Sequence, residues 1–125
     1  MRFISTRIHG FLDYGMGLLL IVAPWLYGFA DGGAETWIPV ILGIGAIGYS
    51  LLTDYELGVA RTIPMATHLM LDIASGIVLA VSPWIFGFAG DVWAPHLILG
   101  LLEIGAGLTT RTTPDTLRVN SRGAV

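Results

Sequence analysis

The residues of this chain that could do chemistry are few, and four of them form two matched pairs. His9 and Asp13 are separated by three residues, and so are His68 and Asp72. Residues at positions i and i+4 share a helix face, so each histidine can contact the aspartate that follows it. A further carboxylate, Glu103, lies inside another apolar stretch. Imidazoles and carboxylates at this spacing suit a proton or a divalent cation such as Zn²⁺ or Mn²⁺.

Two interpretations of these residues stay open. In the first, the histidine and aspartate of each pair hydrogen-bond each other and a neighbouring helix, and these bonds fix how the helices pack. In the second, Asp13, Asp72 and Glu103 line a proton or cation site, with His9 and His68 as ligands or proton acceptors. No cofactor is expected on the first interpretation, and the second allows a divalent metal at His9, Asp13, His68 and Asp72. A bis-His haem between the first and third apolar stretches is a further alternative.

The composition indicates that these residues lie in a lipid environment. The chain has 125 residues, of which 54% are apolar and only 12% charged, whereas a soluble domain is about 25% charged. The absence of cysteine excludes disulfides, thiolate metal sites and a cysteine nucleophile. A net charge of -3 without a basic stripe argues against nucleic acid as a partner. No nucleophile–base pattern or phosphate loop occurs, so an enzyme is not expected.

Four apolar stretches follow one another, at about 8–26, 37–53, 67–86 and 93–110. Each has roughly the length that a helix needs to cross a hydrocarbon core. Backbone polar groups must be satisfied internally in lipid, and the alternation typical of barrel strands is absent, so helices are expected. The predicted fold is therefore all-α, with four transmembrane helices in one membrane domain and a polar tail at 111–125.

Basic and aromatic residues predict the orientation. All six basic residues are arginines, and they lie before the first stretch, between the second and third, and after the fourth. Trp25, Trp37, Trp84 and Trp93 lie at the opposite ends of the stretches. The positive-inside rule and the interfacial preference of tryptophan both place the two termini in the cytoplasm. We expect a multi-pass protein of a bacterial cytoplasmic membrane.

The chain repeats itself. Ala23-Pro24-Trp25 and Gly28-Phe29-Ala30 return as Ser82-Pro83-Trp84 and Gly87-Phe88-Ala89, and the difference between positions 83 and 24 is 59 residues. The repeats, at about 8–53 and 67–110, are each expected to form a two-helix hairpin. Two crossings return the chain to its starting side, so the hairpins should be parallel and related by a pseudo-two-fold axis along the membrane normal.

The repeated corner has a structural explanation. Proline bends or ends a helix, so Pro24 and Pro83 should mark the outer end of the first helix of each hairpin. Gly28 and Gly87 allow the positive φ of a helix cap. With this motif in both hairpins, the chain resembles the SPW-repeat family of small bacterial integral membrane proteins. The resemblance implies a membrane location and this fold, and it implies no activity.

Several further expectations follow from position. Gly43 and Gly100 should be close-packing positions, as should Gly48 and Gly105, which allows self-association as a homo-oligomer or a membrane-protein partner. His96, after Pro95, is expected to be solvated at the outer interface. Two functions remain: a structural or partner-binding membrane protein, and a small proton or divalent-cation transporter or channel that uses Asp13, Asp72 and Glu103.

Overall fold

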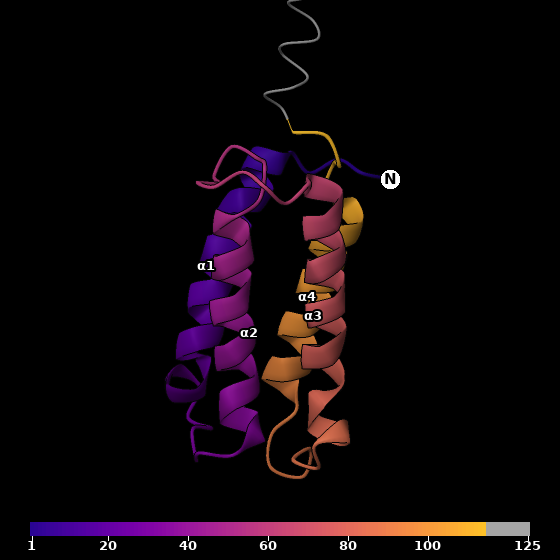
Figure 1. The fold of residues 1–125 in the computed structure, drawn as a ribbon. Coiled ribbons are helices and arrows are strands. Elements are labelled where there is room, and N and C mark those ends of the chain that lie inside the picture. The colour runs from indigo at the N-terminus through magenta and orange to yellow at the C-terminus, as the bar shows by residue number, and fades with distance from the viewer. Residues whose placement is uncertain (115–125) are drawn as a thin grey trace, which may run out of the picture.

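The computed structural model describes residues 1–114. These residues form four α-helices, α1 (Thr6–Leu26), α2 (Ala34–Leu51), α3 (Met65–Ile85) and α4 (Ala94–Thr109) (Figure 1). The side chain of Ser5 caps α1 by accepting the N–H of Ile8 at 3.2 Å. The predicted all-helical fold with four helices is confirmed, whereas most of the predicted tail, from residue 115 onward, lies outside the described residues.

Three of these helices have the dimensions of membrane spans. The helices α1, α2 and α3 have 21, 18 and 21 residues and are apolar enough to cross a bilayer, by length and composition. The apolar α4 has 16 residues, which is shorter than the roughly 20 residues that a full crossing needs. Large apolar side chains are exposed on the outside of all four helices, among them Phe11, Ile41, Met70 and Leu101.

The helices pack as two hairpins that lie side by side (Figure 1). In the first hairpin, a Cβ on Gly43 would lie 2.6 Å from the carbonyl oxygen of Gly17. In the second, a Cβ on Gly100 would lie 2.6 Å from the carbonyl oxygen of Gly76. The predicted close packing at Gly43 and Gly100 is confirmed, because only a residue without a side chain allows these backbones to approach so closely.

Gly48 and Gly105 do not pack closely against another helix of the chain, and their packing against a second copy stays a prediction. Gly48 and Gly105 have open space where a Cβ would stand, and both are exposed. Neither glycine brings two helix backbones together within the described chain; Gly105 lines an opening between α1 and α4.

Short backbone bridges connect the two hairpins at the end of the bundle where α1 and α3 begin and α2 and α4 end. Ile4 pairs with Thr110 and Ile63 pairs with Thr53. The adjacent residues bond in the same way: the N–H of Arg111 reaches the carbonyl of Ile4 at 2.9 Å, and the N–H of Asp54 reaches that of Ile63 at 2.7 Å. The start of each repeat thus contacts the end of the other. The pseudo-two-fold axis itself remains a prediction.

The repeated corners lie at the opposite end of the molecule. The helices continue two residues past the prolines, to Leu26 and Ile85, so Pro24 and Pro83 precede the helix ends and do not form them. The carbonyl of Pro24 accepts the N–H of Phe29 at 2.9 Å, and Gly28 has a φ of 77°. This is the bond from C″ to C3 of a Schellman cap. Gly87 has the same φ, and the N–H of Phe88 bonds the Pro83 carbonyl at 2.8 Å.

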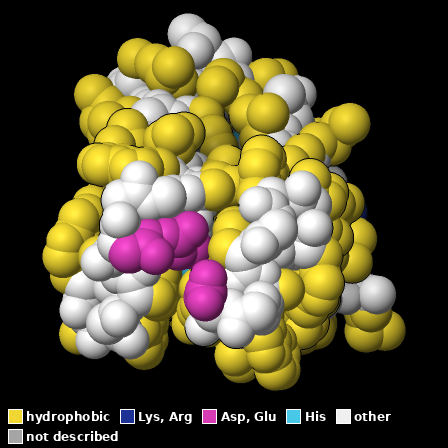
Figure 2. All heavy atoms as spheres, turned by 90° about the horizontal axis from the view of Figure 1, so that it is seen from below, with side chains coloured by type: hydrophobic (Ala, Val, Ile, Leu, Met, Phe, Trp, Pro, Cys, Tyr) yellow, Lys and Arg dark blue, Asp and Glu magenta, His cyan; other side chains and the backbone are white. Residues whose placement is uncertain are grey.

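Tryptophans and acidic loop residues lie at one end of the bundle, and Arg2 lies at the other. All four tryptophans are about half exposed at the end with the corners. Figure 2 shows this end, where acidic side chains gather among apolar ones; the acidic residues of its loops and first turns are Asp31, Glu35 and Asp91. Arg2 lies at the other end, where its guanidinium donates to the carbonyls of Gly107 and Thr110 at 2.9 and 2.7 Å.

Candidate functional site

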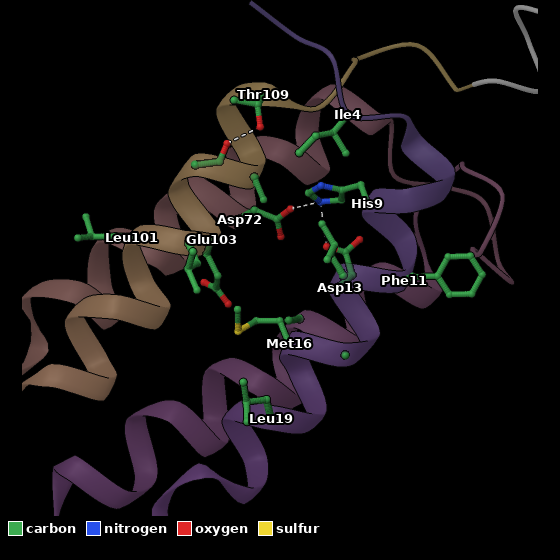
Figure 3. A pocket seen from close by; sticks show the side chains of 16 residues that line it. Ile4, His9, Phe11, Asp13, Met16, Leu19, Asp72, Leu101, Glu103 and Thr109 are labelled. Atoms are coloured by element: carbon green, nitrogen blue, oxygen red, sulfur yellow. Dashed lines mark hydrogen bonds and ion pairs between the residues drawn. The ribbon is translucent and has the colours of Figure 1, made fainter. Parts of the chain in front are cut away.

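The two His–Asp pairs meet between α1 and α3. Nε2 of His9 lies 2.9 Å from a carboxylate oxygen of Asp13 and 2.7 Å from one of Asp72. Nε2 of His68 lies 2.9 Å from Asp13 and 3.2 Å from Asp72. All four side chains are buried, and Figure 3 shows His9, Asp13 and Asp72 pointing toward one another from their helices. Each imidazole contacts both carboxylates, and we call these four residues the His–Asp cluster.

The second ring nitrogen, Nδ1, of each histidine contacts a threonine hydroxyl. Nδ1 of His9 lies 2.7 Å from Oγ1 of Thr110, and Nδ1 of His68 lies 2.7 Å from Oγ1 of Thr53. Both threonine hydroxyls donate their single proton to the backbone carbonyl four residues earlier. A hydroxyl whose only O–H donates to a carbonyl can contact the histidine nitrogen only as an acceptor. The hydrogen-bond network therefore assigns a proton to Nδ1 of both histidines.

This assignment determines what Nε2 can do. A neutral ring with its proton on Nδ1 would direct the Nε2 lone pair at carboxylate oxygens, which is repulsive. A proton on Nε2, a proton on the carboxyl group that faces it, or a cation that binds both groups would remove this repulsion. Nε2 of His68 is fully buried and, although two carboxylate oxygens are near, it is not aligned for a hydrogen bond with either. The buried imidazoles and carboxyl groups therefore need either shared protons or a cation between them.

Two tyrosines support the carboxylates. The Tyr55 hydroxyl donates to Asp13 at 2.8 Å, and the Tyr49 hydroxyl donates to Asp72. Tyr55 belongs to the loop between α2 and α3 and is buried. Burial, together with the nearby charge of Asp13, raises the pKa of the Tyr55 phenol. The phenol therefore remains a donor and orients the carboxylate toward the histidines.

The set of ligands fits a divalent metal ion. The four residues each offer one ligand atom, and these atoms lie within 4.8 Å of one another. Metal-binding histidines usually donate their second N–H to an oxygen acceptor, and ligating carboxylates are themselves hydrogen-bonded. Thr53, Thr110, Tyr49 and Tyr55 provide these outer contacts. Two imidazoles and two carboxylates match the nitrogen and oxygen ligands of Zn²⁺.

Glu103 lies near the His–Asp cluster without joining it. Its Oε2 accepts a hydrogen bond from the Ser75 hydroxyl at 3.1 Å. A cavity of about 580 Å³ separates α1 from α4 here and is lined by Glu103, His9, Asp13 and Asp72 (Figure 3). The structure thus brings Asp13 and Asp72 together and places Glu103 on the wall of an adjoining cavity.

The prediction for His96 was wrong. This residue is 1% exposed, and its ring lies between those of Phe29 and Phe88, at centroid distances of 5.0 and 4.9 Å. Its Nε2 lies 2.9 Å from the backbone carbonyl oxygen of Glu35. The phenylalanines come from the two repeated corners, so the histidine fills the space between them and is not solvated.

Sequence reasoning missed the residues that hold the cluster in place. Thr53 and Thr110 align at the ends of the second helices, and this repeated polar residue was a usable signal. Tyr49 aligns with Ala106, and Tyr55 lies in a loop, so neither is repeated. The role of Tyr49 depends on how α2 packs against α3, and that of Tyr55 on the fold of the loop, so both could be found only from the structure.

These observations define a class of protein: a small four-helix bundle of membrane-spanning composition with a buried His–Asp cluster between two helical hairpins. Residues 7–110 match the SPW repeat domain, so the chain belongs to the SPW repeat family. The match includes both hairpins and all four residues of the cluster. No curated protein and no solved structure matches the chain.

Proposed function

We propose that this protein is an integral membrane protein that binds a divalent metal ion at the His–Asp cluster. The observation that carries the proposal is the orientation of the two histidines. Both Nδ1 atoms are used by threonines, and both Nε2 atoms face the two carboxylates. The proposal is one of binding and exchange and includes no catalytic step.

Charge balance supports the exchange of protons for metal. With both Nε2 atoms protonated, two imidazolium ions balance two carboxylates. With both Nε2 atoms bare, one divalent cation balances the same carboxylates. Both states are neutral overall, which matters because net charge within a bilayer is costly. Metal binding should therefore release about two protons per ion, since ligands must be deprotonated to bind.

Metal titration of the purified protein in lipid nanodiscs tests the proposal. We expect one Zn²⁺ per chain by elemental analysis, with about two protons released per ion in calorimetry across buffers of different ionisation enthalpy. The double variant Asp13→Asn/Asp72→Asn should lose the metal. Glu103→Gln is the matched control, because it neutralises a nearby carboxylate outside the cluster, and it should bind as the wild type does. Equal zinc content in the double variant and the wild type would contradict the proposal.

A structural role is the second candidate, because the cluster joins α1 of one hairpin to α3 of the other. On this account the Asp13→Asn/Asp72→Asn variant, free of metal, should unfold more easily by about 3 kcal/mol or more, since it leaves buried imidazoles without partners. Chemical unfolding in detergent measures this, and unchanged stability would argue against the role.

We further propose a location in a bacterial cytoplasmic membrane with both termini in the cytoplasm. The arginines and tryptophans at opposite ends of the bundle support this orientation, and a compartment-specific reporter fused to either terminus tests it. Self-association through α2 and α4, at the exposed Gly48 and Gly105, is part of the same proposal. A monomeric mass in detergent would contradict it.

A further inference from the structure

The cavity between α1 and α4 has a polar inner wall and an apolar mouth. Its volume is about 580 Å³, and most of its lining is apolar, including Leu12, Met16, Leu19 and Leu102. Phe11 and Leu101 are 62% and 54% exposed, so the cavity opens on the lipid-facing surface of the helices. A molecule dissolved in the bilayer could enter it from the side.

The origin of the cavity lies in a difference between the repeats. Tyr49 of α2 fills the side that faces α3, where its hydroxyl reaches Asp72. The aligned residue in α4 is Ala106, and it lines the cavity. A second difference places Glu103 where the first repeat has Ala46. At this opening the second repeat thus has a small side chain where the first has an aromatic ring, and a carboxyl group where the first has a methyl group.

Glu103 is the carboxylate on this wall that has no cationic partner. Asp13 and Asp72 are paired with histidines, whereas the hydrogen bond found for the Glu103 carboxyl group in the described chain comes from the neutral Ser75. The chain contains no lysine, and the arginines of the described region lie at or beyond the helix ends. A buried carboxyl group without a cation favours its neutral form, so a cationic ligand that enters the cavity would supply the partner that stabilises the charged form.

We propose that the α1–α4 cavity binds a single-chain lipophilic amine, whose ammonium group pairs with Glu103 and whose hydrocarbon chain lies between α1 and α4. Glu103 is six residues from the end of α4, or about 9 Å along the helix axis. A compact ammonium group can reach this depth in the membrane, whereas a phosphate-bearing headgroup would be repelled by the carboxylates. The amine site does not depend on metal binding at the His–Asp cluster.

Electron paramagnetic resonance with a spin-labelled alkylamine tests the proposal. The protein is placed in phosphatidylcholine nanodiscs, and a spin-labelled alkyl alcohol of equal chain length is the neutral comparison probe. We expect the amine to show an immobilised population, with an affinity at least about tenfold higher than that of the alcohol, as a charge-assisted hydrogen bond provides. Glu103→Gln should reduce amine binding to the level of the alcohol. Glu35→Gln, which changes a buried carboxylate at the other end of the bundle, should bind as the wild type does.

A cavity-filling variant tests the location independently. Ala106→Phe restores an aromatic ring where the first repeat has one, and it should abolish the binding of both probes while leaving zinc binding intact. If Glu103→Gln fails to fold, Glu103→Asp retains the charge and should keep a weakened preference for the amine. Equal binding of amine and alcohol by the wild type, unchanged amine binding in Glu103→Gln, or loss of the amine when zinc occupies the cluster would each overturn the proposal.

Discussion

At the scale of single residues, the threonines determine what the histidines can bind. The Nδ1–H groups of His9 and His68 each donate a hydrogen bond to a threonine hydroxyl. Each of these hydroxyls donates its own hydrogen bond to a backbone carbonyl. The rings are thereby fixed in orientation and tautomer, and their Nε2 atoms face the carboxylates. The outer contacts of a metal ligand affect its affinity because they fix its geometry and basicity.

The double variant Thr53→Val/Thr110→Val tests this role. Valine keeps the shape of threonine but cannot accept the Nδ1 proton, so each ring loses its orientation and a buried donor is left unpaired. We expect zinc affinity to fall by about 10- to 100-fold for each site changed, measured by competition with a chelator. Thr62→Val is the control, since this exposed hydroxyl also bonds a backbone carbonyl but lies away from the cluster. An unchanged affinity in the double variant would refute the tautomer assignment.

The sequence predicted part of this site for a clear reason. The i,i+4 spacing brings a histidine and an aspartate together on any helix, so the pairing within each helix was predictable, and it is observed at 2.9 Å in α1 and 3.2 Å in α3. The contact of His9 with Asp72 depends on how α1 and α3 are rotated toward each other. Local spacing does not contain that information, and the tyrosines that support the carboxylates were missed for the same reason.

At the scale of the helices, glycines set the distance within each hairpin. Gly17 and Gly43 bring α1 against α2, and Gly76 and Gly100 bring α3 against α4. The threonines that follow the second helices contact histidines of the opposite hairpin: Thr53, after α2, bonds His68 of α3, and Thr110, after α4, bonds His9 of α1. The glycines thus set the packing within each hairpin, whereas contacts between the hairpins form the cluster.

Substitution of these glycines should destabilise the bundle. The Cβ of Gly43→Ala would lie 2.6 Å from the Gly17 carbonyl oxygen, and that of Gly100→Ala would lie 2.6 Å from backbone atoms of α3. Because backbone must move, we expect each variant to lose about 1–3 kcal/mol of unfolding free energy, measured by denaturant titration in detergent. Gly45→Ala is the matched control, since it has open space around the Cβ position. Equal losses at Gly43 and Gly45 would contradict this packing.

The helices also show which local signals are reliable. Long apolar stretches predicted the number of helices and their bounds to within three residues. The Pro-Trp and Gly signals correctly placed the corners, but they did not reveal that the chain beyond each glycine turns a phenylalanine inward, onto His96. The burial of His96 is a tertiary effect, and its position after Pro95 suggested only an exposed helix start.

At the scale of the whole molecule, the two hairpins meet at both ends of the bundle. The His–Asp cluster and the bridges of Ile4 with Thr110 and Ile63 with Thr53 join them at one end. His96, between Phe29 and Phe88, joins them at the other. A cation at the cluster would therefore hold together two hairpins that have few other polar contacts along their length, and the α1–α4 opening remains beside it.

The central claim is that one divalent ion replaces two protons on the Nε2 atoms of the cluster. Nitrogen-15 NMR of histidine-labelled protein in lipid bilayers, with and without Zn²⁺, observes these atoms directly. Without zinc, we expect both nitrogens of His9 and His68 to be protonated; with zinc, Nε2 should lose its proton while Nδ1 keeps it. His96 serves as the internal reference because it lies at the opposite end of the bundle. Retention of the Nε2 protons in excess zinc, or loss of the Nδ1 protons instead, would contradict the account.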